Sequence, residues 1–414
     1  MSRPVSLVVV GAGMRGTAYA RHAAAAGARV VAVADPDPAR RAAFAAEHGL
    51  PQEDVHAGWT ELAGRRHADA AVVASPDAEH AEQAVALAGA GYHLLLEKPM
   101  ATTEHDARRV VQAVGDTGVI LAVCHVMRYT AYTRVLTGLI EAGAVGEVVS
   151  VQHLEPVGWW HQAHSFVRGN WRREQDAPML LAKSCHDVDW LLHVTGRPVE
   201  RISSFGSLTH FTPANRPQGA ADRCLDCAVE PTCPYSAPRL YLDCLNDPDR
   251  TFWPLSAVTT DHTEAGVRQA LREGPYGRCV YACDNSVVDH QVVSWEAAGG
   301  QTVSFTMTAF TPQEHRKTRI FGTHGYLEGD GLVVRHTDFR TGREEVVDTR
   351  AVSGAAASDE HGGGDEALVD AFLAAVAVGD PGLVWSDAAT SLASHLVVWA
   401  AERARETSTV ITLP

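Results

Sequence analysis

The first third of the chain alternates short hydrophobic runs with longer stretches that carry polar residues at helical spacing. Short runs rich in β-branched residues are typical of buried strands, and longer periodic stretches are typical of helices. The pattern predicts strands at 6–10, 29–34, 70–74, 93–96 and 119–123, and helices at 16–26, 38–47, 78–91 and 103–117. This alternation predicts a parallel α/β sheet with helices on both faces.

The pattern changes after residue 126. Strands are predicted at 148–153, 200–208, 286–295, 302–310, 316–321 and 331–336, and helices at 178–193, 365–377 and 387–405. Strands that follow one another with few helices between them predict an open, mostly antiparallel sheet with helices on one face, which is an α+β domain.

The chain is therefore divided into an N-terminal Rossmann domain at 1–126 and an α+β domain at 127–414. A region at about 210–280 has few strand or helix signals and is rich in Pro, Asn, Asp and Cys, so we interpret it as an insertion in the second domain. A Gly, Ala and Ser-rich stretch at 349–364 predicts a loop.

Composition narrows the class of partner. A length of 414 residues agrees with two or three domains, and the formal net charge of −15 argues against nucleic acid or an anionic membrane, because phosphates attract basic surfaces. The sequence contains no hydrophobic run long enough to span a bilayer. The apolar segment 4–10 is too short for a signal peptide, so we expect a cytoplasmic protein that binds a small molecule.

A glycine-rich loop, Gly11-Ala-Gly13-Met-Arg-Gly16, follows the first predicted strand and opens the first predicted helix. Gly11 permits a tight turn, Gly13 lets the backbone approach a pyrophosphate, and Gly16 lets the helix pack on the sheet. The helix N-terminus offers free N–H groups to the phosphates. Asp35 ends the second strand, where it can accept hydrogen bonds from a ribose 2′-hydroxyl, so the loop predicts NAD rather than NADP.

Glu97-Lys98-Pro99 follows a strand of the first domain, and the carboxyl ends of such strands face the cofactor. Lys98 can orient a substrate hydroxyl there, or exchange its proton. An isolated lysine at a strand end is otherwise usually solvated.

Four features together resemble the glucose–fructose oxidoreductase, inositol dehydrogenase and rhizopine-catabolism (Gfo/Idh/MocA) family. They are the glycine loop with Asp35, Ser75-Pro76-Asp77 with His80, Glu97-Lys98-Pro99, and His186-x-x-Asp189. The resemblance implies a Rossmann domain with an open-sheet α/β domain, a tightly held nicotinamide cofactor, and hydride transfer at a sugar or cyclitol carbon. It also implies a homodimer or homotetramer packed through the second domain's sheet.

The resemblance also implies roles for single residues. Lys98 resembles the family's catalytic lysine and His186 its catalytic histidine. Trp171-Arg172 resembles a motif near the nicotinamide pocket, and Arg128 the arginine after the last Rossmann strand. The predicted cofactor-binding residues are Gly11, Gly13, Met14, Arg15, Gly16, Asp35, Ser75, Pro76, His80, Glu97, Lys98 and Arg128.

The sequence departs from the family pattern just before His186. The family usually has Asp-x-Gly-x-His, whereas Ala182 stands at the place of the Asp, and the segment resembles a branch with Lys-x-Cys-His-Asp. Lys183 precedes His186 by three residues, so on a helix the two share a face. The predicted catalytic set is Lys98, Lys183 and His186, with Asp187 or Asp189 nearby.

Two further segments are candidates for the substrate pocket. His361-Gly-Gly-Gly-Asp365 is either a mobile element over a ligand or a linker ending in a helix-capping Asp. Trp159-Trp160-His161 with His164 either presents aromatic faces to a sugar or belongs to the core. The predicted substrate residues are Trp171, Arg172, Asp189, His361 and Asp365.

The insertion carries a cluster of cysteines. Cys224 and Cys227 have C-x2-C spacing, Cys233 adds a third thiol, and Cys279, Cys244 or Cys283 can supply a fourth. This spacing favours a closed, structural tetrahedral Zn²⁺ site, here assigned to Cys224, Cys227, Cys233 and Cys279. An iron–sulfur cluster and free thiols are the alternatives.

Three functions agree with these features. The first is an NAD-dependent dehydrogenase that takes a hydride from a hydroxyl-bearing carbon of a sugar, amino sugar or cyclitol. The second is a glycoside hydrolase or epimerase that oxidises its substrate transiently with bound NAD. The third is a non-catalytic NAD sensor, suggested by the missing Asp at position 182.

Overall fold

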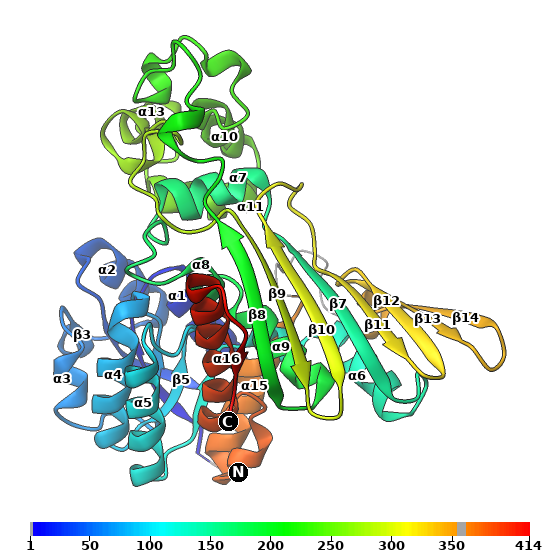
Figure 1. Ribbon diagram of the computed structural model, residues 1–414. Helices are drawn as coiled ribbons and strands as arrows, with labels where there is room; N and C mark the ends of the chain where they lie inside the picture. The colour runs from blue at the N-terminus through cyan, green and yellow to red at the C-terminus, as the bar shows by residue number, and fades with distance from the viewer. Residues whose placement is uncertain (1–2, 354–361) are drawn as a thin grey trace.

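The computed structural model describes residues 3–353 and 362–414. Figure 1 shows a Rossmann domain beside a long, twisted sheet, with an insertion projecting from one end of that sheet above the place where the two domains meet. Among the described residues, no helix combines the length and the hydrophobicity that a membrane span requires.

The first domain is a six-stranded parallel sheet in the order β3-β2-β1-β4-β5-β6. This is the doubly wound Rossmann order, whose direction reverses between β1 and β4. The strands are β1 (Ser6–Val10), β2 (Arg29–Ala34), β3 (Val55–His56), β4 (Ala70–Val73), β5 (His93–Leu96) and β6 (Leu121–Val123). The helices are α1 (Met14–Ala25), α2 (Pro38–His48), α3 (Thr60–Ala63), α4 (His80–Gly89) and α5 (Glu104–Thr117).

The β1 strand is buried along its whole length because helices cover both faces of the sheet. Leu7 and Val9 belong to the core on one face, and Val8 and Val10 to the core on the other. A continuous run of apolar residues is what such a two-sided environment requires, and it confirms the predicted parallel sheet.

The second sheet has nine strands in the order β14-β13-β12-β11-β7-β10-β9-β8-β15. Neighbours pair antiparallel except β7 with β10, so the predicted open, mostly antiparallel sheet is confirmed. The strands are β7 (Val148–Pro156), β8 (Val199–Ser207), β9 (His290–Ala297), β10 (Gln301–Thr308), β11 (Lys317–Gly322), β12 (Gly325–Gly329), β13 (Val333–Asp338), β14 (Arg343–Asp348) and β15 (Ile411–Thr412).

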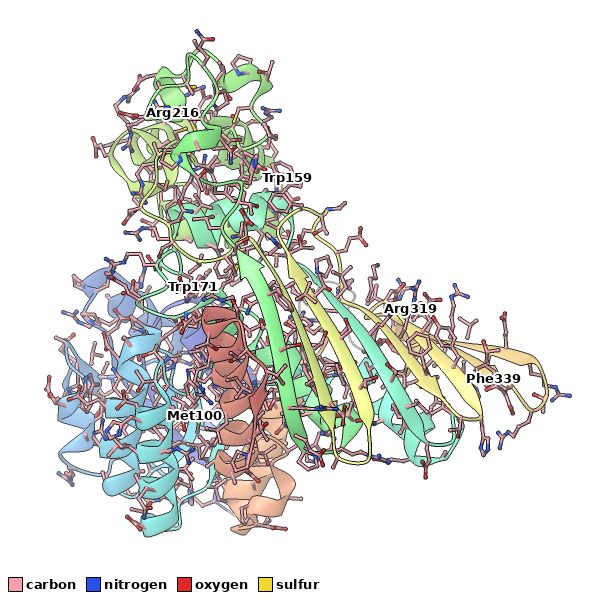
Figure 2. The ribbon with its side chains drawn as sticks, in the orientation of Figure 1. Met100, Trp159, Trp171, Arg216, Arg319 and Phe339 are labelled. Carbon is pink, nitrogen blue, oxygen red and sulfur yellow. The ribbon has the colours of Figure 1, made fainter. Side chains whose placement is uncertain are left out.

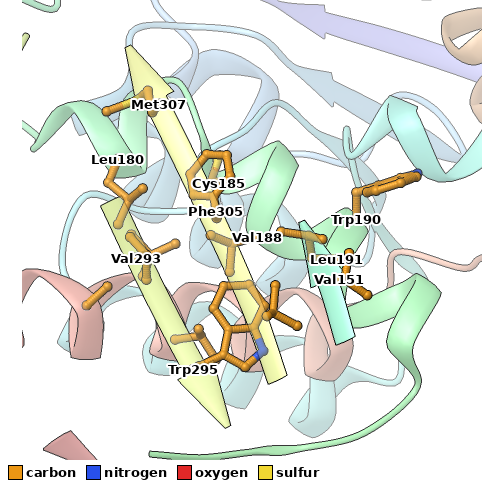
Figure 3. Packing of buried hydrophobic residues seen from close by; sticks show 14 of the residues in the cluster. Val151, Leu180, Cys185, Val188, Trp190, Leu191, Val293, Trp295, Phe305 and Met307 are labelled. Carbon is orange, nitrogen blue, oxygen red and sulfur yellow. The ribbon is translucent and has the colours of Figure 1, made fainter. Parts of the chain in front are cut away.

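One face of this sheet carries the core of the second domain. Figure 3 shows Trp295 and Phe305, on β9 and β10, packed beneath Val188 and Leu191 of α9 (Cys185–Thr195). The opposite face leaves large apolar side chains exposed, namely Val149, Phe205, Val292 and Phe321. The other helices that precede β8 are α6 (Ala131–Glu141), α7 (Trp159–His161), which continues into a π-helix at Gln162–Arg168, and α8 (Met179–Ala182).

The C-terminal part of the chain returns to the first domain. After α14 (Arg350–Ser353), α15 (Gly364–Val378) buries Leu368 and Phe372 in the Rossmann core, and α16 (Ala388–Thr407) packs against both α5 and α9. The Rossmann domain is therefore completed by a helix that the division at residue 126 assigned to the second domain.

The insertion lies between β8 and β9 and consists of short helices joined by turns. Its helices are α10 (Ala237–Asp243), α11 (Pro248–Arg250), α12 (Ser256–Val258) and α13 (Glu264–Glu273). Tyr241, Leu255 and Leu271 form part of a small core of their own.

Candidate active site

The glycine loop between β1 and α1 has the space that a dinucleotide needs. Gly11 has a φ of +91°, and a Cβ there would stand 2.5 Å from the carbonyl oxygen of Ala74. A Cβ on Gly16 would stand 1.9 Å from the carbonyl oxygen of Gly11. A Cβ on Gly13 would meet no atom within 4 Å, so this glycine faces open space. The loop thus leaves room for phosphates at Gly13, beside the N-terminus of α1, which begins at Met14.

Asp35 supports this loop from the end of β2. It is buried, and its carboxylate accepts the N–H groups of Ala12 and Asp37, both at 2.8 Å. Carboxylate oxygens have further lone pairs, so these bonds leave capacity for a ribose hydroxyl. The open space at Gly13 and the acid at the end of β2 together fit NAD.

The side chain of Arg15 is held by two carboxylates and a tyrosine ring. Its Nε donates to Glu97 at 2.8 Å, its Nη2 lies 2.5 Å from Asp365, and its guanidinium stacks 4.6 Å from the ring of Tyr19. Burial would raise the pKa of Glu97, but the charges of Arg15 and Lys98 hold it below its usual value. Arg15 and Asp365, predicted to bind cofactor and substrate, form an ion pair that fastens α15 to the first domain. His361 lies outside the described residues.

His80 connects two loops at the carboxyl ends of the Rossmann strands. It is buried, and its ring nitrogens lie 2.9 Å from the carbonyl oxygen of Ser75 and 2.7 Å from that of Pro99. The hydroxyl of Ser75 donates to Gln83, whereas Pro76 is exposed. The ring of His80 therefore contacts backbone on both sides and holds the segment that carries Lys98.

Lys98 reaches across to the second domain. It is partly exposed, and its Nζ donates to the carbonyl oxygen of Ala182 at 3.0 Å and lies 5.9 Å from the centre of the Trp171 ring. The indole N–H of Trp171 donates in turn to Asp77 of the first domain. Figure 2 shows Trp171 between the Rossmann domain and the insertion.

The predicted helix at 178–193 is broken, so the expectation that Lys183 and His186 share one helix face is wrong. The α8 helix ends at Ala182, and α9 begins at Cys185. Lys183 lies at the break and binds Glu155 of β7 at 3.1 Å, while His186 is in the first turn of α9. Both residues are partly exposed.

Lys98, Trp171, Lys183 and His186 thus lie where the two domains meet, and we call this group the junction site. The ring of His186 lies 5.8 Å from that of His125, which is fully buried beside it. Burial lowers the pKa of His125 to about 4. A neutral imidazole therefore stands next to His186, and it adds no positive charge to a site that already holds two lysines.

Lys183 is part of a charged network that the sequence analysis missed. Glu155 is buried between Lys183 and Arg316, and Arg316 also binds Asp187 at 2.5 Å. Burial would raise the pKa of Asp187, but the charge of Arg316 and the hydrogen bond from His153 lower it well below its usual value. The alternating pattern of β7 could have indicated this network, because the polar residues His153 and Glu155 occupy inward positions of the strand.

Arg128 and Asp189, predicted to bind cofactor and substrate, form a buried ion pair. Both are buried, and the guanidinium binds the carboxylate through two hydrogen bonds of 2.6 and 2.8 Å. Their contact joins the end of the Rossmann sheet to α9, the helix that carries His186.

The predicted substrate residue Arg172 binds the insertion. Its guanidinium donates to both carboxylate oxygens of Asp284, at 2.8 and 3.0 Å. The hydrogen bond from Arg172 lowers the pKa of Asp284, and a hydrogen bond from Arg278 adds to this effect. Both outweigh partial burial, which would raise the pKa. Arg172 therefore anchors the base of the insertion next to Trp171.

An aromatic cluster stands beside Lys183. The rings of Trp160 and His161 lie 5.2 and 4.9 Å from that of Trp253, which comes from the insertion. These three side chains are partly exposed, whereas His164 is buried and bound to Tyr241. Burial, together with the charge of Lys183, holds the pKa of His161 well below its usual value. The cluster offers aromatic faces near the junction site, and the buried ring of His164 packs edge-on against Trp253, with 5.5 Å between the ring centres.

The four predicted zinc ligands line one small cavity in the insertion: Cys224, Cys227, Cys233 and Cys279. Cys244 and Cys283 do not line it. Within the described ranges, the one group of metal-binding side chains with all ligand atoms within 4.8 Å of one another is Glu174, Glu402 and Glu406, which share Arg405. The four sulfur atoms are therefore more widely spaced than in a closed zinc site.

Comparison with known proteins identifies the family. Residues 5–125 match the oxidoreductase family with an NAD-binding Rossmann fold, and residues 137–413 match the family's C-terminal alpha/beta domain. The chain belongs to the Gfo/Idh/MocA family. The predicted family is thereby confirmed.

Individual relatives of this Gfo/Idh/MocA protein differ in activity. It is 39% identical to inositol 2-dehydrogenase 1 of Saccharopolyspora erythraea over 150 residues, covering 36% of this chain and 44% of that protein. It is 27% identical to the 2,7-anhydro-N-acetylneuraminate hydratase of Mediterraneibacter gnavus over 206 residues, covering 49% and 53%. The chain spans about half the length of the curated relatives that it matches.

A solved structure of levoglucosan dehydrogenase in complex with NADH and levoglucosan has the same fold. Its TM-score is 0.74 at 19% identity, with all of both chains covered. The insertion and the broken helix before His186 thus belong to a chain whose overall architecture is that of the family.

Proposed function

We propose that this protein is an NAD-dependent oxidoreductase that removes a hydride from a hydroxyl-bearing carbon of a sugar, amino sugar or cyclitol. The observation that carries the proposal is the junction site, where Lys98, Lys183 and His186 are partly exposed beside the open glycine loop. Relatives named inositol dehydrogenase and levoglucosan dehydrogenase support the polyhydroxylated substrate class.

Gly13, the N-terminus of α1 and Asp35 would hold the cofactor. When bound, NAD supplies the hydride acceptor. The protein must hold the reacting hydroxyl and take its proton. In this proposal Lys98 and His186 hydrogen-bond one substrate hydroxyl, and the Nζ of Lys98 is held by the carbonyl oxygen of Ala182 at 3.0 Å. His186 accepts the proton, and a positioned general base of this kind contributes about 10²–10⁴-fold in rate.

The side chains around Lys98 and His186 narrow the class of substrate. Lys183 keeps its charge balanced by Glu155, so it can donate to a second hydroxyl without adding an uncompensated charge. Trp160, His161 and Trp253 offer aromatic faces to the apolar side of a ring. Neutral, ring-shaped polyols match both features.

A second candidate is a redox-neutral reaction, in which a transiently oxidised sugar loses or gains a group and is reduced again. The relative named 2,7-anhydro-N-acetylneuraminate hydratase favours it. The same junction site would serve both reactions, because each begins with removal of a hydroxyl proton.

A panel of sugars, amino sugars and cyclitols, assayed with NAD, separates these functions. Accumulation of NADH with one class of substrate supports the dehydrogenase. Release of an aglycone, or formation of an isomer, with no net NADH supports the redox-neutral reaction. Bound NAD with no turnover on either panel would contradict both and favour a sensor.

We also propose a homodimer or homotetramer. The exposed face of the second sheet carries Val149, Phe205, Val292 and Phe321, of which Phe205 and Val292 are cross-strand partners, and exposed apolar side chains on one face are typical of an interaction site. Phe205→Glu is expected to shift the mass in solution, measured by light scattering, toward the monomer. An unchanged mass for Phe205→Glu, or a monomeric wild type, would contradict this assembly.

A further inference from the structure

The insertion brings four of its cysteines to one cavity, in addition to forming a small apolar core. Cys224 and Cys279 are brought together by a short antiparallel contact, in which Arg223 pairs with Arg278 and the N–H of Cys279 donates to Asp222 at 2.8 Å. Cys227 and Cys233 follow two successive short turns, at Cys224–Asp226 and Glu230–Thr232. Thiols that are distant in the sequence therefore face one cavity.

The cavity between these thiols has room for a single ion. Its volume is about 20 Å³, and its lining includes all four thiols and the side chain of Arg168. A space of this size admits one water molecule or one metal ion.

Arg168, which also lines the cavity, is a buried charged residue. It ends the π-helix Gln162–Arg168 and is 1% exposed. Its Nε donates to the carbonyl oxygen of Arg278 at 2.8 Å, and its Nη2 donates to the carbonyl oxygen of Tyr235 at 2.7 Å and lies 3.5 Å from the sulfur of Cys224. Its Nη1 has no hydrogen-bond partner, and in the described part of the chain no carboxylate lies within 4.0 Å of the guanidinium.

A buried guanidinium without a counter-ion is costly, and neutral thiols do not offset its charge. A Zn²⁺ ion bound by four thiolates carries two net negative charges. Such a site would supply the missing counter-charge at the cavity that Arg168 already lines. Each thiol can move toward an ion by changing its rotamer, so the present spacing of the sulfurs allows a tetrahedral site to close.

We infer that Cys224, Cys227, Cys233 and Cys279 form a closed, structural zinc site, and that the buried guanidinium of Arg168 is its counter-ion. The site stabilises the insertion, because the free energy of metal binding becomes free energy of folding. It also fastens the insertion to the helix that begins at Trp159, and so fixes Trp253 against His161. This inference is independent of the NAD reaction.

Metal analysis of the full-length protein, purified without chelator, tests the site directly. We expect about one zinc ion per chain, and, after exchange for Co²⁺, the intense sulfur-to-cobalt charge-transfer absorption of a tetrahedral thiolate site. A folded wild type that contains no zinc and takes up neither metal would overturn the inference. Iron with inorganic sulfide would overturn it as well.

Two sets of variants test the residues. Cys227→Ser and Cys233→Ser are expected to lose the metal, whereas Cys283→Ser, which alters a thiol outside the cavity, is expected to keep it. Arg168→Met is expected to weaken zinc binding about 10–100-fold in competition with a chromogenic chelator, because partners of metal ligands contribute about this much, and Arg168→Lys is expected to bind more tightly than Arg168→Met. Equal affinities of Arg168→Met and wild type would overturn the role of Arg168.

Limited proteolysis of the wild type tests the structural metal even if these variants do not fold. Removal of zinc by a strong chelator is expected to speed tryptic cleavage between residues 208 and 289 and to leave the Rossmann domain resistant. Cleavage at the same rate with and without the chelator would contradict a structural metal.

Discussion

Single charged residues hold the junction site in place by binding one another. Arg128 and Asp189 lie 61 positions apart in the sequence and form a buried, doubly hydrogen-bonded pair. The sequence identified both as polar residues in family-like positions, but no local pattern shows which distant side chain a buried charge will meet. Lys98 was accessible to prediction because it ends a recognisable Rossmann strand. The contact between Arg15 and Asp365 could not be predicted, because the pair spans 350 positions.

The buried pair gives a prediction about stability. Asp189→Asn leaves the charge of Arg128 buried without a counter-ion, so we expect the free energy of unfolding to fall by about 3–5 kcal/mol. Urea titration followed by circular dichroism measures it. Glu328→Gln breaks the exposed pair with Arg319 and is expected to cost less than about 1 kcal/mol. Equal losses in the two variants would contradict the buried pair.

At the scale of elements, the alternation of strands and helices predicted five of the six Rossmann strands, because these five are mostly buried. It missed the two-residue β3 and the four-residue α3, which are too short to show a pattern. The region 178–193 was predicted as one helix since its apolar residues continue through it. The break at Lys183 depends on contacts from other elements, with Lys98 binding the carbonyl of Ala182 and Glu155 binding Lys183. Three helices of the insertion were missed because they have seven residues or fewer. The fourth, α13, has ten residues and Thr263 as its N-cap, so its sequence did carry a helical signal.

The glycine loop gives a prediction at this scale. Gly13→Ala places a methyl group in open space at a φ of −74°, which alanine adopts readily, so we expect the free energy of unfolding to change by less than about 1 kcal/mol. The methyl group would stand where the phosphates approach, so NAD affinity should fall.

Gly16→Ala is the matched control. Its Cβ would collide with the carbonyl oxygen of Gly11, so this variant should lose stability as well as NAD affinity. Calorimetry gives NAD affinity and thermal unfolding gives stability. Wild-type NAD affinity in a folded Gly13→Ala variant would contradict a phosphate site at Gly13.

At the scale of the whole molecule, several buried histidines make stability depend on pH. Burial lowers the pKa of His125 and His193 to about 4 and that of His164 and His395 to about 3. The unfolded chain binds these protons near pH 6.5, whereas the folded chain resists them. Their contribution to stability is therefore complete above about pH 6.5 and is lost as the pH falls from there toward 3.

His125→Phe tests this dependence, since it keeps a ring between His186 and His395 but removes the titrating group. The slope of the unfolding free energy against pH, measured between pH 6.5 and 4, should decrease by up to one proton relative to wild type. Replacement of the exposed His105 by Gln should leave the slope unchanged. A slope for His125→Phe equal to that of wild type would contradict the assignment.

Turnover of variants at the junction site shows whether these residues perform the proton and hydride chemistry. With the best substrate of the panel, kcat for NADH formation should fall about 10²–10⁴-fold in His186→Ala and strongly in Lys98→Ala, while NADH binding, followed by its fluorescence, stays near wild type. His105→Gln, altered far from the site on the exposed face of α5, should keep full activity. Undiminished kcat in both His186→Ala and Lys98→Ala would contradict the account.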